Sequence, residues 1–301
     1  MARGDDPEVL RESGADVVRD LQSLAWCKER IMAKHIGDLP HALTHGQELA
    51  RRLAGKVPAV FLDYDGTLTP IVDRPEDAVI SQRMRNAVRQ LAERCPVCVV
   101  SGRDRRVVQE LMGLDNLIVA GSHGFDIWSP KEGTIEREEG AEFEALLDEV
   151  KARLHEEIDP IEGALVEPKK ASVAAHYRLV PEEERPKVKE VVDTILAEHP
   201  DELRVTPGKM VYEIQPKIEW DKGKAVLYLL EALNLDRDDV VPLYLGDDVT
   251  DEDAFEALAD RGVGIFVGHA DDPEVSGRTT SADYILHTTE EVRQFLDTLA
   301  R

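Results

Sequence analysis

Two aspartates, Asp63 and Asp65, follow a short apolar run and lead directly into a Gly-Thr turn. The segment reads Val60-Phe-Leu-Asp-Tyr-Asp-Gly-Thr-Leu-Thr-Pro70, so a strand delivers both carboxylates to its end and the turn brings them to one pocket. Paired carboxylates at a strand end suit a metal-bound phosphoryl group, because one can attack phosphorus while the other moves a proton. An Asp-x-Asp pair by itself is also typical of an ordinary polar turn. The catalytic interpretation therefore requires further reactive residues elsewhere in the chain.

Two further polar residues stand where such a pair needs them. Ser101 closes a second apolar run ahead of a helix, and a hydroxyl there can hold a phosphoryl oxygen or simply cap the helix. Lys222 opens another helix, where its charge opposes the helix dipole. That position gains a purpose if the ammonium neutralises phosphate and the attacking aspartate. Lys224 is the competing candidate, and the Lys-Gly order favours Lys222.

An acidic segment, Leu245-Gly-Asp-Asp-Val-Thr-Asp251, provides a candidate metal site. Asp247 and Asp248 follow a third apolar run, and Asp251 lies on the opening turn of a helix. Clustered carboxylates suit Mg²⁺, which keeps several waters and needs few protein ligands. An acidic helix cap would explain Asp251, but it does not explain two acids at the end of the strand.

The elements that position these groups alternate along the chain. Continuous apolar runs predict strands buried on both faces, as in a parallel sheet covered by helices. The expected strands are 57–62, 97–100, 117–120, 240–245, 264–267 and 284–286, and the expected helices lie near 81–94, 103–112, 223–234, 251–261 and 289–300. The pattern predicts an α/β fold with a Rossmann-like parallel-sheet core.

The middle of the chain has a different pattern. Helical stripes at 141–158 and 188–196 alternate with a half-exposed strand at 172–178 and a hairpin at 203–214. We therefore expect an inserted α+β cap domain, which could exclude water and read the substrate. The expected division is an N-terminal helical segment 1–54, a first core segment 55–139, the cap 140–214 and a second core segment 215–301.

Composition limits the partners and the compartment. The 301 residues include 61 acidic and 37 basic ones, and the net charge of −24 disfavours nucleic acid and anionic membranes as partners. An anionic substrate would need a metal and placed cations. The chain shows no apolar run of ~18 residues and no signal-peptide pattern, so we expect a cytoplasmic protein. Three cysteines argue against a disulfide framework, and Cys95 and Cys98 are interpreted as structural.

The order Asp63-x-Asp-Gly-Thr, Ser101, Lys222 and Gly246-Asp-Asp-x-x-Asp resembles the four motifs of haloacid dehalogenase-superfamily phosphatases. More narrowly, Asp-Gly-Thr-Leu-Thr-Pro70, Ser101-Gly-Arg-Asp104, Glu167-Pro-Lys-Lys-Ala-Ser-Val-Ala-Ala-His-Tyr-Arg178 and Gly246-Asp-Asp-Val-Thr-Asp-Glu-Asp-Ala-Phe255 are similar to trehalose-6-phosphate phosphatases. The likeness covers residues 57–300. It implies Mg²⁺-dependent hydrolysis of a small sugar phosphate in trehalose biosynthesis, and functional association with a trehalose-6-phosphate synthase.

The resemblance also implies residue roles. Asp63 is the nucleophile and Asp65 the acid and base, while Ser101 and Lys222 hold the phosphoryl oxygens. Mg²⁺ is held by the Asp63 carboxylate, the Asp65 backbone carbonyl and Asp247, with Asp248 or Asp251 in support. The expected sugar contacts are Glu167, Lys169 and Arg178 of the cap, Lys209 and Glu213 of its returning hairpin, and Arg103 of the core.

Two alternatives remain open from the sequence. The same chemistry could act on sucrose phosphate, mannosyl-phosphoglycerate or a monosaccharide phosphate, or the chain could be a non-catalytic sugar-phosphate-binding regulatory module. His123, in Gly121-Ser-His-Gly124, is interpreted as a packed or loop histidine rather than a catalytic one.

Overall fold

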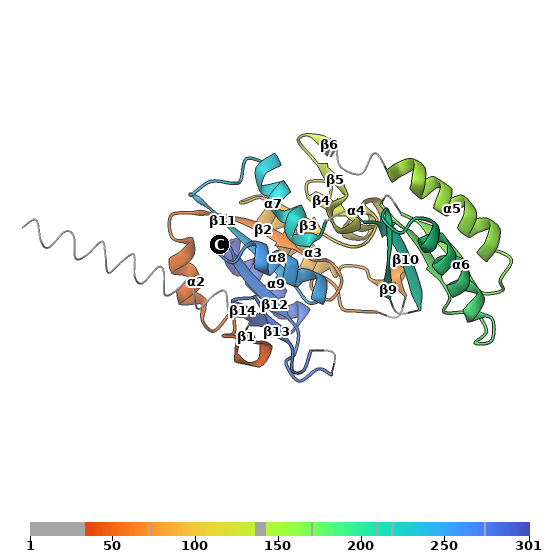
Figure 1. The fold of residues 1–301 in the computed structure, drawn as a ribbon. Coiled ribbons are helices and arrows are strands. Elements are labelled where there is room, and N and C mark those ends of the chain that lie inside the picture. Colours follow the sequence, from red (N-terminus) through yellow and green to blue (C-terminus); the bar gives the residue numbers. More distant parts are fainter. Residues whose placement is uncertain are drawn as a thin grey trace, which may run out of the picture.

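The computed structural model describes residues 34–301 except 73, 136–142, 170, 209, 218, 219 and 274. Of residues 207 and 208 it describes the backbone only. Its centre is an eight-stranded sheet in the order β14-β12-β11-β2-β3-β4-β5-β6 (Figure 1). The six predicted strands form its parallel part and are confirmed: β2 (Val57–Leu62), β3 (Val97–Val100), β4 (Ile118–Gly121), β11 (Val240–Gly246), β12 (Val263–Val267) and β14 (Tyr284–Leu286).

Two strands that the sequence did not predict extend the sheet. β5 (Asp126–Ser129) pairs antiparallel with β4, and β6 (Gly133–Ile135) pairs antiparallel with β5. Both are short, so neither carries an apolar run long enough to stand out in the sequence. They bring the chain to the point at which it leaves for the middle segment.

Helices cover both faces of the core sheet. On one face lie α2 (Gly46–Leu53), α3 (Gln82–Ala92), α4 (Arg105–Met112) and α9 (Thr289–Leu299), and on the other lie α7 (Lys222–Ala232) and α8 (Glu252–Ala257). Side chains at the helix N-termini accept backbone N–H bonds: Ser81 for α3, Asp104 for α4, Asp221 for α7 and Thr288 for α9. The helix predicted over 251–261 ends at Ala257, because β12 begins at Val263 and the chain needs the intervening residues to turn back.

The middle segment forms a second, four-stranded antiparallel sheet in the order β7-β8-β10-β9. Its strands are β7 (Leu165–Pro168), β8 (Val173–His176), β9 (Leu203–Gly208) and β10 (Val211–Pro216). The helices α5 (Glu144–Ile158) and α6 (Arg185–Glu198) lie on the side of this sheet away from the core (Figure 1). The cap sheet therefore presents its other face toward the core. β10 continues to Pro216, two residues beyond the boundary expected at 214.

One prediction for this segment is wrong and one element was missed. The strand at 172–178 is not half-exposed, since Ser172 and Ala174 are 3% and 0% exposed. Ala174 lies in register between Glu167 of β7 and Glu213 of β10, and these longer side chains flank it. β7 was not predicted, because Leu165-Val-Glu-Pro168 contains too few apolar residues to show a period.

The N-terminal segment is not helical throughout its described part. β1 (Lys34–His35) pairs with β13 (Thr279–Thr280), a short 3₁₀ turn follows at Ile36–Asp38, and only α2 is an α-helix. Gly37 and Pro40 disfavour a continuous helix here. Ile36 and Leu39 are buried against the core instead. The helix expected over residues 1–33 lies outside the described residues.

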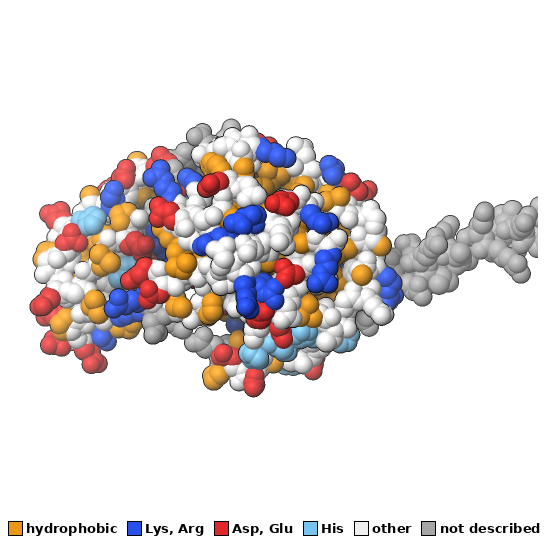
Figure 2. Space-filling view, turned by 180° about the vertical axis from the view of Figure 1, so that it is seen from behind, with side chains coloured by type: hydrophobic (Ala, Val, Ile, Leu, Met, Phe, Trp, Pro, Cys, Tyr) orange, Lys and Arg blue, Asp and Glu red, His pale blue; other side chains and the backbone are white. Residues whose placement is uncertain are grey.

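Because parallel strands end at one edge, the loops that follow β2, β3 and β11 meet there. In the view from behind, Lys and Arg side chains are interspersed with Asp and Glu over the surface (Figure 2).

Within the described residues, no helix has the length and apolar character needed to cross a membrane. Cys95 and Cys98 are buried and unpaired, as a structural role requires, and burial raises the pKa of the Cys95 thiol to about 11.

Candidate active site

The centre of the site is a buried lysine between two aspartates. Asp63 follows β2, where its backbone N–H donates to the Leu245 carbonyl of β11 at 2.9 Å. Lys222, the first residue of α7, donates from Nζ to Asp63 Oδ1 and to Asp251 Oδ1, both at 2.7 Å. Asp63 and Lys222 are only 5% and 4% exposed. Burial alone would lower the pKa of Lys222, but Asp251 and Asp63 raise it, so the ammonium stays charged.

This geometry distinguishes Lys222 from Lys224. The Lys224 side chain is 43% exposed, and its Nζ lies 3.9 Å from Asp221 Oδ2, one turn back on the same helix. Asp221 also caps α7 by accepting the Lys224 backbone N–H at 2.7 Å. The cap therefore fixes the first turn of the helix with Lys222 directed into the sheet edge.

Asp251 is the best-connected carboxylate of the site. Its Oδ1 accepts from Lys222 Nζ and from the Tyr244 hydroxyl at 2.6 Å, and its Oδ2 accepts from the Asp248 N–H at 2.9 Å. Tyr244 was not predicted as a site residue. A tyrosine inside an otherwise aliphatic strand, just before Gly-Asp-Asp, was the available signal. With both oxygens engaged, Asp251 orients Lys222.

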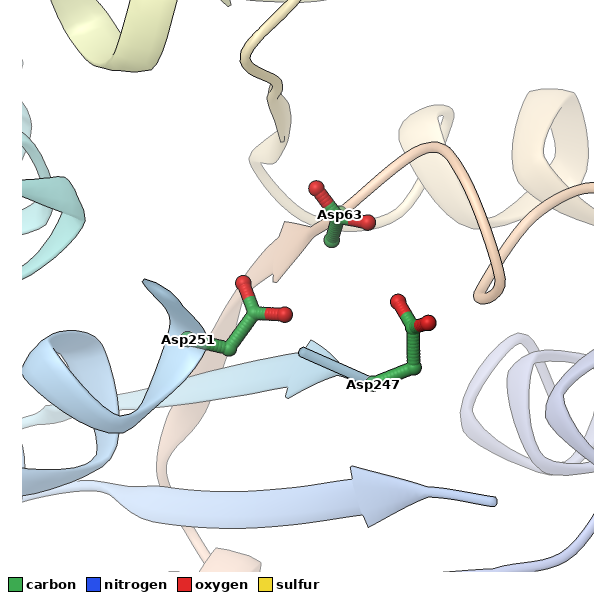
Figure 3. Close-up of side chains that lie close together, drawn as sticks. All are labelled: Asp63, Asp247 and Asp251. Atoms are coloured by element: carbon green, nitrogen blue, oxygen red, sulfur yellow. The ribbon is translucent and has the colours of Figure 1, made fainter. Parts of the chain in front are cut away.

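Three carboxylates converge on one point at this edge. Asp63, Asp247 and Asp251 each offer an oxygen such that the three atoms lie within 4.8 Å of one another (Figure 3). Gly66 permits the approach, because it has φ +77° and a Cβ there would lie 2.0 Å from Asp247 Oδ2. Asp248, also predicted as a ligand, lies outside this cluster. Its carboxylate accepts the Val249 N–H and caps the 3₁₀ turn Val249–Asp251.

The cluster has the properties of a divalent-cation site. Asp247 Oδ1 is buried and has no hydrogen-bond partner among the described residues. Burial raises the pKa of Asp247 to about 9 and that of Asp63 to about 7, and neighbouring carboxylates add to both shifts. Lys222 supplies one positive charge for three carboxylates. Hard oxygen ligands around an uncompensated negative charge fit Mg²⁺.

Asp65 does not point into this cluster but pairs with Arg103. Arg103 Nε donates to Asp65 Oδ2 and Nη2 donates to Oδ1, both at 2.6 Å, while Nη1 donates to the Pro75 carbonyl at 2.7 Å. The bond to Asp65 raises the pKa of Arg103 further above its ordinary value. Arg103, predicted as a sugar contact, thus has a carboxylate of the core as its partner.

Ser101 lies directly after β3 and is 1% exposed. Its hydroxyl accepts the Arg103 N–H at 3.2 Å, so the serine closes the turn that leads into α4. The hydroxyl hydrogen remains available for an acceptor. A phosphoryl oxygen at the opening of this helix would be such an acceptor.

The cap sheet presents an ion pair and a carboxylate–imidazole contact on its inner face. Glu213 Oε1 accepts from Lys169 Nζ at 3.1 Å and from the Ser172 hydroxyl at 2.7 Å. Glu167 Oε2 lies 2.7 Å from His176 Nε2, and this contact lowers the pKa of Glu167. Ser172 and His176 were not predicted as site residues, although both lie inside the segment that carries the family resemblance. Mixed donors and acceptors on one face suit sugar hydroxyls.

Two predicted sugar contacts, Arg178 and Lys209, are not part of these two pairs. Arg178 is exposed and lies two residues beyond β8. That position is toward the end of the cap sheet at which His176 pairs with Leu165, and away from the end at which Val173 pairs with Pro168. Lys209 lies outside the described residues.

His123 has a place in the site that the sequence interpretation did not give it. Its backbone has φ +56°, and Ser122 before it has φ +50°. Its carbonyl accepts from Trp220 Nε1 at 3.0 Å, close to the start of α7. Burial and Lys222 lower the pKa of His123 to about 4, so its imidazole is neutral. The Gly-Ser-His-Gly order signalled a tight turn but not its position.

The chain was compared with known proteins. The family model of trehalose-phosphatase matches residues 61–289. The chain is 42% identical over 277 residues to a probable trehalose-phosphate phosphatase D of Arabidopsis thaliana, covering 89% of this chain and 73% of the relative. It is 39% identical over 296 residues to a trehalose-phosphate phosphatase of Mycobacterium tuberculosis, covering 98% of this chain and 73% of the relative.

Solved structures show the same fold. An Aspergillus fumigatus trehalose-6-phosphate phosphatase has a TM-score of 0.60 at 27% identity, covering 87% of this chain and 98% of its own. The C-terminal domain of a Candida albicans trehalose synthase regulatory protein has a TM-score of 0.62 at 14% identity, covering 88% and 100%. A haloacid dehalogenase-like hydrolase of Bacteroides thetaiotaomicron has a TM-score of 0.58 at 18% identity, covering 81% and 100%.

The fold is therefore that of the haloacid dehalogenase-like hydrolases. The family match spans the aspartate pair, the serine and lysine positions and the acidic cluster. By this match and by its identity to the curated relatives, the chain belongs to the trehalose-phosphatase family.

Proposed function

We propose that this protein hydrolyses trehalose 6-phosphate to trehalose and phosphate in a Mg²⁺-dependent reaction. The observation that carries the proposal is the Lys222 ammonium, 2.7 Å from both Asp63 and Asp251, beside the three-carboxylate cluster. This arrangement supplies a nucleophile, a charge for the phosphoryl group and a place for the cation. Its occurrence in a chain of the trehalose-phosphatase family supports the choice of sugar.

In the first step, an Asp63 oxygen attacks phosphorus, and the bond from phosphorus to the sugar oxygen breaks. Asp65 donates the proton that the departing sugar oxygen needs. In the second step, water attacks the aspartyl-phosphate and Asp65 takes its proton, which restores the Asp63 carboxylate and releases phosphate. Both Asp65 oxygens accept from Arg103 in this structure, so the arginine holds the acid and base beside the site before the reaction.

The surrounding residues stabilise charge on the transferring group. Lys222 and the Ser101 hydroxyl donate to the phosphoryl oxygens, where charge is spread in the transition state. The carboxylates of Asp63 and Asp247 and the backbone carbonyl of Asp65 would hold Mg²⁺, with Asp251 in support. When bound, this ion neutralises phosphoryl charge.

The cap would read the sugar. We propose that residues 140–214, extended to the end of β10, act as a lid over the site, with residues 55–139 and 215–301 forming the core and 1–54 an N-terminal segment. Glu167, Lys169, Arg178, Lys209 and Glu213 are the proposed sugar contacts. We further propose a cytoplasmic location and functional association with a trehalose-6-phosphate synthase, on the basis of the family and the chain's composition.

Phosphate release from trehalose 6-phosphate, with Mg²⁺ or with EDTA, tests the proposal. We expect turnover only with Mg²⁺, and lower kcat/KM for sucrose phosphate, mannosyl-phosphoglycerate and glucose 6-phosphate. A higher kcat/KM for glucose 6-phosphate would contradict the assignment of the substrate. Binding of trehalose 6-phosphate without phosphate release would identify a regulatory module instead.

The variant Asp63→Asn tests the assignment of the nucleophile. An amide of similar shape cannot form the aspartyl-phosphate, so turnover should be lost while the unfolding midpoint stays near that of the wild type. Residual activity above about a tenth of the wild-type rate would mean that another group attacks phosphorus.

A further inference from the structure

His123 occupies the junction of three parts of the site. Its backbone N–H donates to the Ser101 carbonyl at 2.8 Å, and its carbonyl accepts from Trp220 Nε1 at 3.0 Å, two residues before Lys222. These contacts tie the loop after β4 to the serine loop on one side and to the start of α7 on the other. His123 is therefore fixed beside the proposed phosphoryl pocket.

The imidazole fills a space that the neighbouring glycine leaves open. A Cβ on Gly102 would lie 2.8 Å from both Cε1 and Nε2 of His123, so the ring packs directly over the backbone that follows Ser101. The charges that act on the ring come from the core residues Lys222 and Asp251 and from the cap residues Glu213 and Lys169. The charges of the phosphoryl pocket and those of the cap's inner face thus both act on the ring.

The hydrogen bonds of this loop to Ser101 and Trp220 do not use the imidazole. The contacts that hold the loop use the backbone atoms of His123, and glycine would make them equally well. At φ +56°, a side chain adds strain that glycine avoids, and two consecutive non-glycine residues in this region are uncommon. A strained residue in a site, held by its surroundings, points to a role for the side chain itself.

The protonation state of the His123 imidazole limits the groups that it can bind. Burial and the nearby Lys222 keep the imidazole neutral, so it offers one N–H donor and one acceptor. Because the imidazole is neutral, it adds no charge to a pocket in which Lys222 already supplies a positive charge. It is suited to a hydroxyl group, which both donates and accepts.

We propose that His123 contacts the substrate and hydrogen-bonds a hydroxyl of the phosphorylated sugar ring, so that it helps to select a sugar phosphate over a small phosphate ester. The inference rests on the proposed function. The ring packs on the backbone that follows Ser101, at the edge of the proposed phosphoryl pocket, where the sugar of a bound ester would begin. His123 is thereby a specificity-determining residue as well as a packed one.

The test compares His123→Gly with the wild type on trehalose 6-phosphate and on p-nitrophenyl phosphate. Glycine keeps the backbone conformation and removes the ring. We expect kcat/KM to fall about tenfold for the sugar phosphate and to stay within about twofold for the aryl ester. His123→Asn, which tolerates positive φ and keeps a donor and an acceptor, should recover part of the loss and serves as the test if the glycine variant unfolds.

Ser122→Gly is the matched control, because it changes the neighbouring left-handed residue and leaves the imidazole in place. It should leave kcat/KM for both substrates unchanged. Equal losses on both substrates in His123→Gly, or no loss on the sugar phosphate, would overturn the inference. A wild-type protein that does not hydrolyse trehalose 6-phosphate would instead overturn the proposed function.

Discussion

Arg103 donates hydrogen bonds of 2.6 Å to both carboxylate oxygens of Asp65. A guanidinium that grips a carboxylate with two parallel bonds fixes its direction as well as its position. Asp65 is the proposed acid and base, so the arginine controls where this residue points before the reaction. The charge of Arg103 also acts on Glu167 of the cap, whose pKa is lowered mainly by its contact with His176.

The first prediction concerns this pair. Arg103→Ala should lower kcat at least about tenfold on both trehalose 6-phosphate and p-nitrophenyl phosphate, because Asp65 activates water for every ester. Arg103→Lys should recover little, since lysine lacks the planar fork. Steady-state kinetics on both substrates measures this. The control is Arg106→Ala, an exposed arginine of α4. A loss confined to the sugar phosphate would show that Arg103 is a sugar contact only.

The second prediction separates two neighbouring acids. Asp247 belongs to the cluster and has a buried oxygen without a partner among the described residues, whereas Asp248 caps the following turn. We expect Asp247→Asn to raise the Mg²⁺ concentration for half-maximal activity about tenfold or more, since it removes a charged ligand. Asp248→Asn should change it little, because asparagine caps equally well. Mg²⁺ titrations of activity and calorimetric binding decide the matter. Equal shifts in both variants would place Asp248 among the ligands.

The third prediction follows from the raised pKa values of Asp63 and Asp247, about 7 and about 9 against an ordinary 3.8. The folded, metal-free protein then keeps protons that the unfolded chain has already released. Its stability therefore falls as pH rises from about 4 through about 9. We expect the unfolding midpoint in EDTA to drop between about pH 5 and 8.

Stabilisation by Mg²⁺ should grow over the same interval, because the ion and the protons compete for the same carboxylates. Differential scanning fluorimetry with Mg²⁺ and with EDTA at each pH measures both effects. Asp247→Asn should flatten the two curves. A Mg²⁺ effect that is independent of pH would argue against these carboxylates as its ligands.

The fourth prediction tests the cap. Glu213 is held by Lys169 and Ser172 on the inner face. Glu213→Gln should lower kcat/KM for trehalose 6-phosphate about tenfold and leave p-nitrophenyl phosphate nearly unchanged. Glu190→Gln, at an exposed position on α6, is the control. Equal losses on both substrates would remove the specificity argument.

The same assay applied to Glu167→Ala and Arg178→Ala ranks the remaining contacts. Both should affect the disaccharide phosphate more than the aryl ester if the resemblance assigns them correctly. Arg178 lies toward the other end of the cap sheet from Lys169, so a loss there would extend the sugar site along β8.

The sequence predicted the parallel core because short, continuous apolar runs between helical patterns are typical of strands buried on both faces. Once β2 and β11 are neighbours, Asp63 and Asp247 must lie at one edge, and their meeting follows from topology. The position of Lys222 followed from its place at a helix start. The strands and the helix start could be predicted from hydrophobic periodicity. The meeting of the carboxylates followed from the rule that parallel strands end at the same edge of a sheet.

The remainder depends on contacts that no local pattern encodes. Asp251 joins the cluster and Asp248 does not, although both take part in the capping box of the turn between them. The Arg103–Asp65 pair joins two loops through a long side chain. The β1–β13 pairing joins segments far apart in the chain, and it replaced the helix expected there.

The order of the strands in the sheet affects how the protein can fold during its synthesis. β2 is flanked by β3 and by β11, and the whole cap is translated between these two neighbours. At the usual rate of synthesis, Asp63 is added to the chain roughly ten to forty seconds before Asp247. During that time β2 has an unpaired hydrophobic edge, which invites aggregation or chaperone binding. A chain halted before β11 would carry Asp63 and Asp65 but neither Asp247 nor Asp251, so the three-carboxylate cluster forms only after residue 251 has been added.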